Sequence, residues 1–439
     1  MVFSVLKKDL KAFRQDLKGQ DLIFYLGLAF IVLYYLRPQV IIPGLNIIPW
    51  LQITILVGFL AMAGNSRLKF TGTHFLVFLF ATLAWLSAMN SLYPDISSRN
   101  ITTPFIFALE VLFLSNCVKN VKQLQLLLIV FFICIFKMSF FGARVWAGRG
   151  FGFAQWGIQG PTGFFQNSGE FSLLMAICAV MSIPFIIYMK PKTKAYWLLP
   201  LTAAMTVMGA SSRGGQLALL VGLIYLLLAY KKIRFKNLVY VTVFVSVAWA
   251  LFPEEQKARF ETAGSDQTST TRLGYWEAGI DMAKNYPLLG VGFGSFPEHY
   301  HRFYKINDGS YLSRRKEVAH NSLIEVVSQL GIPALILYIW LHFSVFSNWS
   351  LLKKHKDPGP ELVFLESFRV SLNGAVLTYF VGAFFMSITF YPYIYFLLAL
   401  AIINARLIKE SEREMKMQKG IFSADATMSA LTKGSLDVK

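Results

Sequence analysis

The fold of this chain is organised around one long polar stretch, Pro253–Gly331, in an otherwise apolar sequence. The stretch contains STTRLGYW (Ser269–Trp276), PLLGVGFG (Pro287–Gly294) and AHNSLIE (Ala319–Glu325). A hydrophobic segment ends just before the stretch, and another begins just after it. This pattern is typical of a large loop between two membrane-spanning helices.

The composition favours a membrane protein. Of the 439 residues, 55% are hydrophobic and only 15% are charged, whereas a soluble chain carries about 25% charged residues. Apolar runs of roughly 15 to 25 residues recur along the sequence, and they do not alternate with polar residues as barrel strands do. The sequence therefore predicts an all-α polytopic membrane protein with about twelve transmembrane helices.

The large loop is expected between the ninth and tenth spans. The expected spans are approximately Leu22–Leu36, Ile47–Ala63, Phe75–Met89, Ile101–Cys117, Leu124–Phe141, Ser168–Met189, Ala195–Ala210, Gln216–Tyr230, Leu238–Phe252, Asn321–Ser347, Leu362–Met386 and Tyr391–Ile408. The chain then divides into a basic N-terminal segment at 1–21, nine spans at 22–252, the outer loop at 253–320, three spans at 321–408 and a tail at 409–439.

Basic residues indicate which way the chain crosses the membrane. They cluster in alternate connections, for example Lys231–Lys236 and Lys353–Lys356, while the intervening short connections carry few charges. The positive-inside rule therefore predicts that both termini are cytoplasmic and that the loop 253–320 faces the periplasm. The net charge of +18 has this orienting role, so no nucleic-acid partner is expected.

No metal site and no cofactor are expected. Cys117, Cys134 and Cys178 lie in or at the edge of apolar spans without metal-ligand spacing, and His299 and His301 lack a third ligand nearby. The glycine-rich PLLGVGFG motif is a turn rather than a dinucleotide fingerprint, because no βαβ unit surrounds it.

Arg213 stands at the end of an apolar span, flanked by Ser211, Ser212, Gly214 and Gly215. An arginine at bilayer depth costs about 2.5–3.5 kcal/mol on insertion scales, so it usually has a partner or a function. The glycines leave backbone N–H groups accessible, which suits an anion site. The alternative is a helix-end arginine that extends its guanidinium to the interface.

Arg272 opens a predicted helix that runs from Arg272 to Lys284. Arg272, Trp276 and Ile280 share one face of this helix. An arginine at a helix start is well placed to bind phosphate. The alternative is a structural cation–π stack of Arg272 on Trp276.

His320 lies where the outer loop meets the tenth expected span. Two arginines nearby would lower its pKa from about 6.5 and keep it neutral, so that it could accept a proton. The alternative is a histidine that only caps a helix or occupies the interface.

Taken together, these segments resemble the bacterial O-antigen ligase and polymerase superfamily. The resemblance rests on Arg272 and Trp276 in one helix, the PLxGxG turn, HNxxL at His320 with a later glycine, SSRG at Arg213 and GFFxN ending at Asn167. It covers the chain from about residue 142 to residue 331, and the remainder only as hydrophobic spans.

This resemblance implies an inverting, metal-independent glycosyltransferase in the bacterial inner membrane. Its donor would be an undecaprenyl-diphosphate-linked glycan, and its acceptor a saccharide hydroxyl on lipid A core or on a repeat unit. Arg213 and Arg272 would bind the donor diphosphate, and His320 would activate the acceptor hydroxyl on the periplasmic face. The further substrate-binding candidates are Trp276, Asn167 and Arg149.

Two alternatives to an O-antigen ligase stay open at this point. A polymerase of O-antigen or exopolysaccharide repeat units would share the superfamily features. A transporter of polysaccharide or lipid-linked glycan, which is a different class, would suit twelve spans and the intramembrane Glu110 and Lys137. Against the transporter, the chain shows no internal repeat.

Overall fold

The structure is a computed structural model. It describes residues 2–65, 67–152, 157–229, 266–304, 316–346 and 358–434, with single positions at 242, 246, 254, 257 and 261. Within these residues every regular element is a helix and no β-strand occurs, which confirms the all-α prediction for the described part. The expected ninth span, Leu238–Phe252, lies almost wholly outside it.

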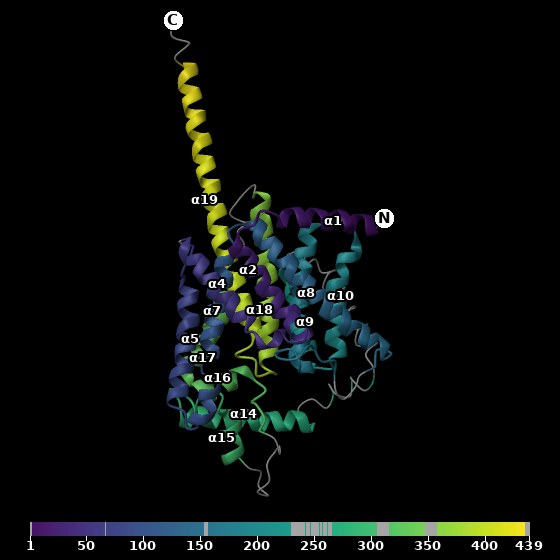
Figure 1. The fold of residues 1–439 in the computed structure, drawn as a ribbon, viewed down its shortest axis with the longest axis vertical. Helices are drawn as coiled ribbons and strands as arrows, with labels where there is room; N and C mark the ends of the chain where they lie inside the picture. Colours follow the sequence, from purple (N-terminus) through teal and green to yellow (C-terminus); the bar gives the residue numbers. More distant parts are fainter. Residues whose placement is uncertain are drawn as a thin grey trace.

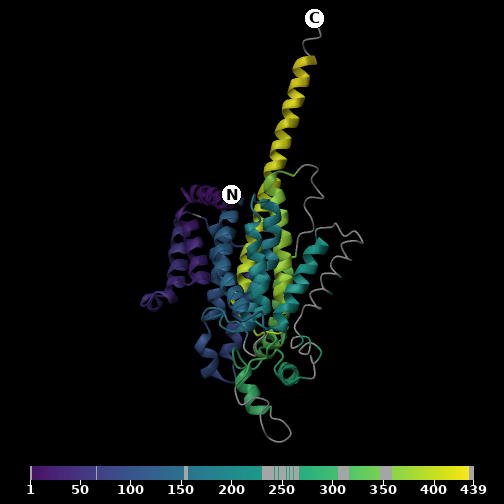
Figure 2. The same cartoon turned by 90° about the vertical axis from the view of Figure 1, so that its right-hand side faces the viewer.

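Long apolar helices stand side by side and form the body of the molecule (Figures 1 and 2). Among the described residues, five helices are long and apolar enough to cross a membrane: Gly72–Met89, Pro94–Cys117, Val121–Gly148, Ser168–Met189 and Pro392–Met417. Four shorter apolar helices are Leu22–Leu36, Trp50–Gly64, Arg213–Ala229 and Ile332–Ser344. All nine overlap expected spans, which supports a polytopic membrane protein, and the number twelve stays a prediction.

The elements of the bundle follow one another with few long connections. In chain order they are α2 (Leu22–Ile31), η1 (Val32–Leu36), α3 (Pro38–Ile41), η2 (Leu45–Ile47), α4 (Trp50–Gly64), α5 (Gly72–Met89), α6 (Pro94–Ser97), η3 (Ser98–Asn100), α7 (Thr103–Cys117), α8 (Val121–Gly148), α9 (Ser168–Met189), η4 (Lys194–Trp197), α10 (Leu198–Gly209), α11 (Arg213–Ala229), α17 (Ile332–Ser344), α18 (Pro360–Ala383) and α19 (Pro392–Gly434). The helix α9 packs against α10, α11 and α18.

Glycines let α11 approach its neighbours closely. A Cβ at Gly215 would come 2.0 Å from the Oγ of Ser172 on α9, and a Cβ at Gly222 would come 2.1 Å from the Oγ1 of Thr378 on α18. Small residues allow this kind of contact in membrane bundles. The packing fixes the point at which α11 begins, and its first residue is Arg213.

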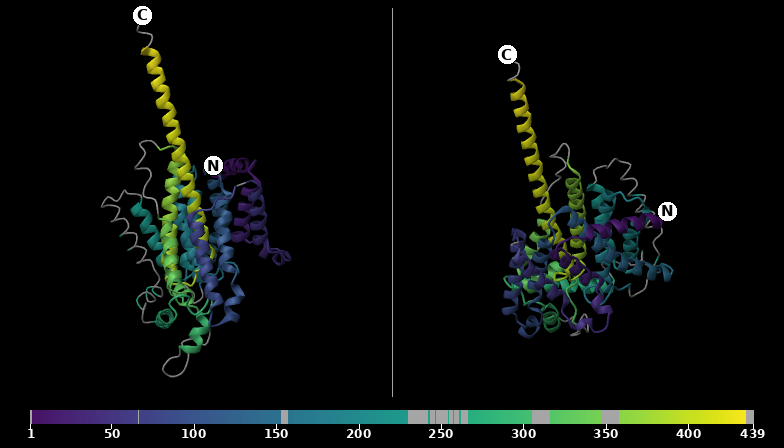
Figure 3. Two further views of the ribbon diagram at one scale, coloured as in Figure 1. Left: turned by 90° about the vertical axis from the view of Figure 1, so that its left-hand side faces the viewer. Right: turned by 45° about the horizontal axis from the view of Figure 1, so that its top comes forward.

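Both ends of the chain lie at one end of the bundle (Figures 1 and 3). The helix α1 (Val2–Leu17) lies across that end, roughly perpendicular to the bundle helices, as a basic amphipathic helix on a membrane surface would. The helix α19 continues to Gly434 and projects beyond the bundle. The helix thus runs on past Ile408, where the twelfth expected span ends, and no proline or glycine interrupts residues 393–419.

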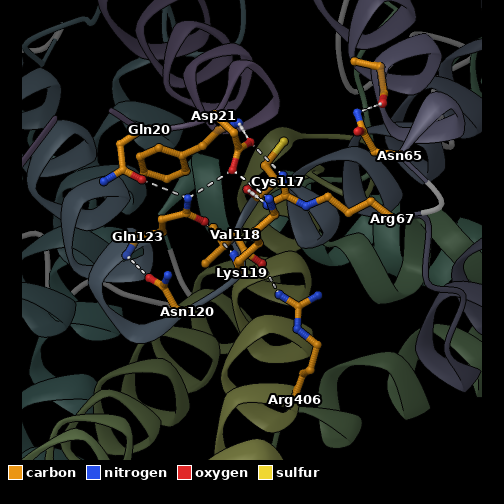
Figure 4. Close-up of polar contacts among 12 residues, drawn as sticks. Gln20, Asp21, Asn65, Arg67, Cys117, Val118, Lys119, Asn120, Gln123 and Arg406 are labelled. Atoms are coloured by element: carbon orange, nitrogen blue, oxygen red, sulfur yellow. Dashed lines mark hydrogen bonds and ion pairs between the residues drawn. The ribbon is translucent and has the colours of Figure 1, made fainter. Parts of the chain in front are cut away.

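A polar network ties the helices together at this same end (Figure 4). The carboxylate of Asp21 lies 2.7 Å from Arg67 Nη1 and 3.1 Å from Lys119 Nζ. Arg67 also donates to the carbonyl oxygen of Cys117 at 2.8 Å. Arg406 of α19 donates to two carbonyl oxygens at the end of α7. The network therefore holds α2, α7 and α19 together at the end of the bundle far from the polar stretch.

The polar stretch lies at the opposite end of the bundle. There α14 (Gln267–Asn285) crosses the helix ends, and α15 (Phe296–Phe303) lies on its outer side (Figures 1 and 2). The helix expected over Arg272–Lys284 is confirmed, and it is longer at its N-terminus. The extension starts at Asp266, whose side chain accepts a hydrogen bond from Ser269 N and caps the helix.

The expected tenth span is not one helix. In place of a single helix over Asn321–Ser347, the structure has α16 (Ser322–Leu330) and α17 (Ile332–Ser344). Gly331 separates them at φ +86°, in the left-handed region that favours glycine.

The PLLGVGFG turn explains this break. Val291 N donates to Ser328 O at 2.9 Å, and Ile332 N donates to Pro287 O at 2.8 Å. The turn thus occupies the backbone groups at which a continuous helix would have closed its own hydrogen bonds. The two halves of the polar stretch are held together by this contact.

Candidate functional site

Several helix starts gather at the outer end of the bundle. A Cβ on Gly169, in the first turn of α9, would lie 3.6 Å from the Oγ of Ser212, just before α11. The start of α16 is held on the α18–α19 connection, because Ser322 Oγ donates to Met386 O at 2.7 Å and accepts from Ile388 N at 2.9 Å. The N-termini of helices carry partial positive charge, so this end favours anions.

Arg213 is paired with a carboxylate of the protein. Its Nη1 lies 2.9 Å from Asp266 Oδ2, and its Nη2 lies 3.2 Å from Asp266 Oδ1. The Arg213 guanidinium and the hydrogen bonds from Ser269 hold the pKa of Asp266 well below its usual range. Because Asp266 is the N-cap of α14, Arg213 fixes the start of the helix that carries Arg272.

Arg272 is half-buried one and a half turns beyond Asp266, and in the part of the chain that the structure describes it has no hydrogen bond or ion pair. Burial lowers its pKa, and the charge of Arg213 adds to this effect. A half-buried cation without a protein partner can take an anionic ligand. This is the arrangement that a phosphate group would complete.

The expected cation–π pair of Arg272 and Trp276 is not among the contacts of the described residues. Trp276 instead donates from its Nε1 to the carbonyl oxygen of Ala319 at 3.1 Å. This bond ties α14 to the residue that precedes His320. The structure therefore gives Trp276 a positioning contact, and Arg272 is not stacked on it.

His320 is the last residue before the N-cap of α16. Its backbone has φ +50°, a left-handed conformation that is costly for a non-glycine residue. The next residue, Asn321, caps α16 by accepting from Leu323 N at 2.9 Å and Ile324 N at 3.3 Å. The cap holds the backbone, so the imidazole stays at the junction between loop and helix.

The surroundings of His320 keep its imidazole neutral. Burial, and then the charge of Arg272, lower its pKa from 6.5 to about 4. Arg272 is close enough to His320, and Arg213 to Arg272, for their charges to interact, but of the two arginines expected to lower the pKa of His320 only Arg272 does so. That all three side chains line one cavity stays a prediction. A neutral imidazole at this position can accept a proton at pH 7.

Glu317 is a neighbour of His320 that the sequence analysis missed. Its Oε2 lies 3.8 Å from His320 Nε2, with 36% of its side chain and 30% of the histidine side chain exposed. This distance is too long for a hydrogen bond, and Glu317 would meet a positive charge there only after His320 has taken a proton. An acidic residue three positions before the histidine was the available signal.

Asn167 and Arg149 lie in different places relative to Arg213, Arg272 and His320. Asn167 caps α9, accepting from Gly169 N at 2.8 Å, and so lies beside the turn that leads to Arg213. Arg149 follows the end of α8 and is exposed, and no described contact joins it to the other candidates.

Two carboxylates near this end were not predicted as site residues. Glu170 accepts from Tyr391 Oη at 2.9 Å, and Glu325 accepts from Thr389 Oγ1 at 2.7 Å. Both therefore contact the connection that also holds the start of α16. No group of three or more His, Cys, Asp or Glu side chains suited to a metal ion is found among the described residues.

Residues 198–339 match the family model described as O-antigen ligase. This range includes Arg213, Arg272, Trp276 and His320. Over this range the chain is similar to the O-antigen ligase and polymerase superfamily.

A curated protein is also similar to this chain over part of its length. It is the exopolysaccharide production protein ExoQ of Rhizobium meliloti (strain 1021), which is 30% identical over 135 residues. The alignment covers 29% of this chain and 31% of that protein. The chain thus matches about a third of the relative's length.

Proposed function

We propose that this protein is a glycosyltransferase of the bacterial inner membrane. It moves a glycan from undecaprenyl diphosphate to an acceptor hydroxyl on the periplasmic face, with both chain termini in the cytoplasm. The observation that carries the proposal is Arg272, a half-buried cation with no partner among the described residues, beside a histidine that is neutral at pH 7. The O-antigen ligase match over these residues supports it.

In the proposed reaction the acceptor oxygen attacks the anomeric carbon of the donor sugar. The bond from that carbon to the diphosphate oxygen breaks, and undecaprenyl diphosphate leaves with the electron pair. Arg272 binds the departing diphosphate, and Arg213 adds a second positive charge. His320 takes the hydroxyl proton, and attack from the opposite face inverts the anomeric centre.

In this proposal Arg213 both adds positive charge for the diphosphate and fixes the start of α14 through Asp266. One pair of variants separates these two roles. Asp266→Asn keeps a capping side chain and removes the carboxylate that pairs with Arg213, whereas Arg213→Ala removes the positive charge. We expect Arg213→Ala to slow transfer by about ten-fold or more, and Asp266→Asn by less. Single-turnover transfer in nanodiscs measures both. Equal losses, with no further loss in the double variant, would make Arg213 a positioning residue only.

A repeat-unit polymerase is the second candidate, and it uses the same chemistry. The observation that favours it is the similarity to a protein named for exopolysaccharide production. In that case the acceptor is a new lipid-linked repeat unit, and in the ligase case it is lipid A core. The comparisons offer no support for the transporter alternative.

Deletion of the gene in its source cell tests the function. Glycans on the lipid carrier and at the cell surface are sized with and without the wild-type protein. Long chains stranded on the carrier indicate a ligase, and single repeat units indicate a polymerase. A deletion strain with unchanged carrier-linked and surface glycans would refute the proposed function.

A further inference from the structure

We propose that the outer side of α14 and α15 is a glycan subsite, which binds saccharide units away from the reacting carbon. The subsite consists of Asp281, Asn285, Tyr286, Phe303 and Tyr304, which we call the outer platform. The inference rests on the proposed function, because it assigns part of the same substrate to a surface that the reaction itself does not use.

The outer platform presents aromatic rings to solvent. Phe303 is 67% exposed and Tyr286 is 36% exposed. Their rings surround the buried imidazole of His299, with centroid distances of 4.8 Å for Phe303, 5.9 Å for Tyr286 and 6.2 Å for Tyr304. Because the buried ring of His299 packs behind them, the exposed rings form a fixed apolar surface on which the C–H face of a sugar can stack.

Polar groups for sugar hydroxyls lie at the edge of these rings. The exposed carboxylate of Asp281 accepts from Tyr304 Oη at 2.5 Å and from Asn285 Nδ2 at 3.4 Å. A carboxylate has about four acceptor positions, so further donors can bind it, and the exposed Asn285 amide offers both donors and an acceptor. Apolar rings with a few placed polar groups are what a neutral, hydroxyl-rich ligand requires.

The platform is held rigidly on the bundle. The hydroxyl of Tyr93, in the connection after α5, lies 3.0 Å from His299 Nδ1, and the Arg302 guanidinium lies 4.9 Å above the Tyr93 ring. Glu298 accepts from Arg302 Nε at 2.7 Å and also pairs with Lys316. Because the surface is preformed, binding does not have to order it.

Contact with lipid does not account for these exposed rings. The helix α15 lies on the side of α14 that faces away from the bundle (Figures 1 and 2). The rings therefore lie beyond the layer of apolar helices. By contrast, exposed phenylalanines such as Phe343 belong to bundle helices, where lipid covers them.

The platform is also within reach of the proposed donor site. Asp281 follows Arg272 by nine residues on the same helix, which corresponds to about 14 Å along its axis and about half a turn around it. A glycan whose diphosphate is bound at Arg272 can therefore pass over α14 and reach the platform with later sugar units. The platform would then bind the later sugars of a glycan with several units, and it would not contact the first sugar.

The test measures binding of the free oligosaccharide, released from its diphosphate carrier, to the full-length protein in nanodiscs. Titration calorimetry is done on wild type, Phe303→Ala and Tyr286→Ala, with Phe343→Ala as the matched control at 60% exposure. We expect each platform variant to weaken binding by roughly three- to ten-fold, in line with the contribution of a ring contact. The Phe343→Ala control should bind as wild type does.

The outcomes separate this inference from the proposed function. If wild type transfers glycan from the lipid-linked donor but does not bind the free oligosaccharide, the subsite is refuted and the function stands. Unchanged binding in both platform variants would also refute it, and would leave a protein partner as the occupant of these rings. If wild type binds the oligosaccharide but transfers none in the presence of donor and acceptor, the proposed function fails.

Discussion

Replacing His320 with alanine is expected to slow glycan transfer by about 10²–10⁴-fold while the protein stays folded in the membrane. A sugar hydroxyl is a weak nucleophile, so loss of the base removes the step that takes its proton. The side chain is half-buried, and Asn321 caps α16 independently of it, so the fold should persist. Single-turnover transfer from a defined lipid-linked donor measures the effect.

The control for this prediction is His301→Ala, which removes another histidine of the same outer segment. Wild-type rates for His320→Ala would show that the histidine only shapes the junction. The pH profile gives a second readout, because a base must be neutral to act. With a pKa lowered to about 4, His320 stays neutral as the pH falls from 7 to about 5. The rate should fall near pH 4, and a fall near 6.5 would contradict the geometry.

Replacing Arg272 with alanine is expected to have the second large effect on the rate of glycan transfer. A hydrogen bond to a charged group contributes about 1.5–3 kcal/mol, so losing it at a breaking bond should slow transfer by about 10- to 150-fold. Arg272 has no protein partner among the described residues, so its removal should not destabilise α14. Donor titration together with single-turnover rates separates weaker binding from slower chemistry.

Two further variants sharpen the Arg272 experiment. Arg272→Lys keeps the charge but loses the bidentate fork, so it should recover only part of the rate. Arg99→Ala removes an exposed arginine that bonds only its own local backbone, and it should behave as wild type. If Arg272→Ala bound and transferred the donor normally, the diphosphate site would have to lie away from α14.

Part of the site could be predicted from the local sequence. Arg272 and Trp276 are four residues apart, and that spacing alone placed them on one helix. The contacts of Trp276 and Arg213 could not be predicted from the sequence, because their partners are remote in the chain. Trp276 bonds to Ala319, 43 residues away, and Arg213 pairs with Asp266, 53 residues away. Such pairings depend on how segments meet and not on their own residue patterns.

The break at Gly331 shows the same limit. Residues 321–347 read as one apolar run, and hydrophobicity does not reveal which backbone groups another segment will bind. The PLLGVGFG turn docks there, and a Cβ at Gly290 would meet the carbonyl carbon of Gln329 at 2.2 Å. Gly290 therefore serves a contact between segments that are about 40 residues apart in the sequence.

By itself the sequence determined that this chain is an all-α membrane protein and that its polar chemistry is concentrated in one stretch. Apolar runs determine which segments enter the bilayer, and charge clusters determine their orientation. Each segment does so through its own residues, without contacts to the rest of the chain. Only the tertiary structure decided that Arg213 is paired with Asp266, that Arg272 has no partner in the described part of the chain, and that Glu317 lies beside His320. These relations decide the electrostatics of the site because charges interact through distance in space, and folding alone sets that distance.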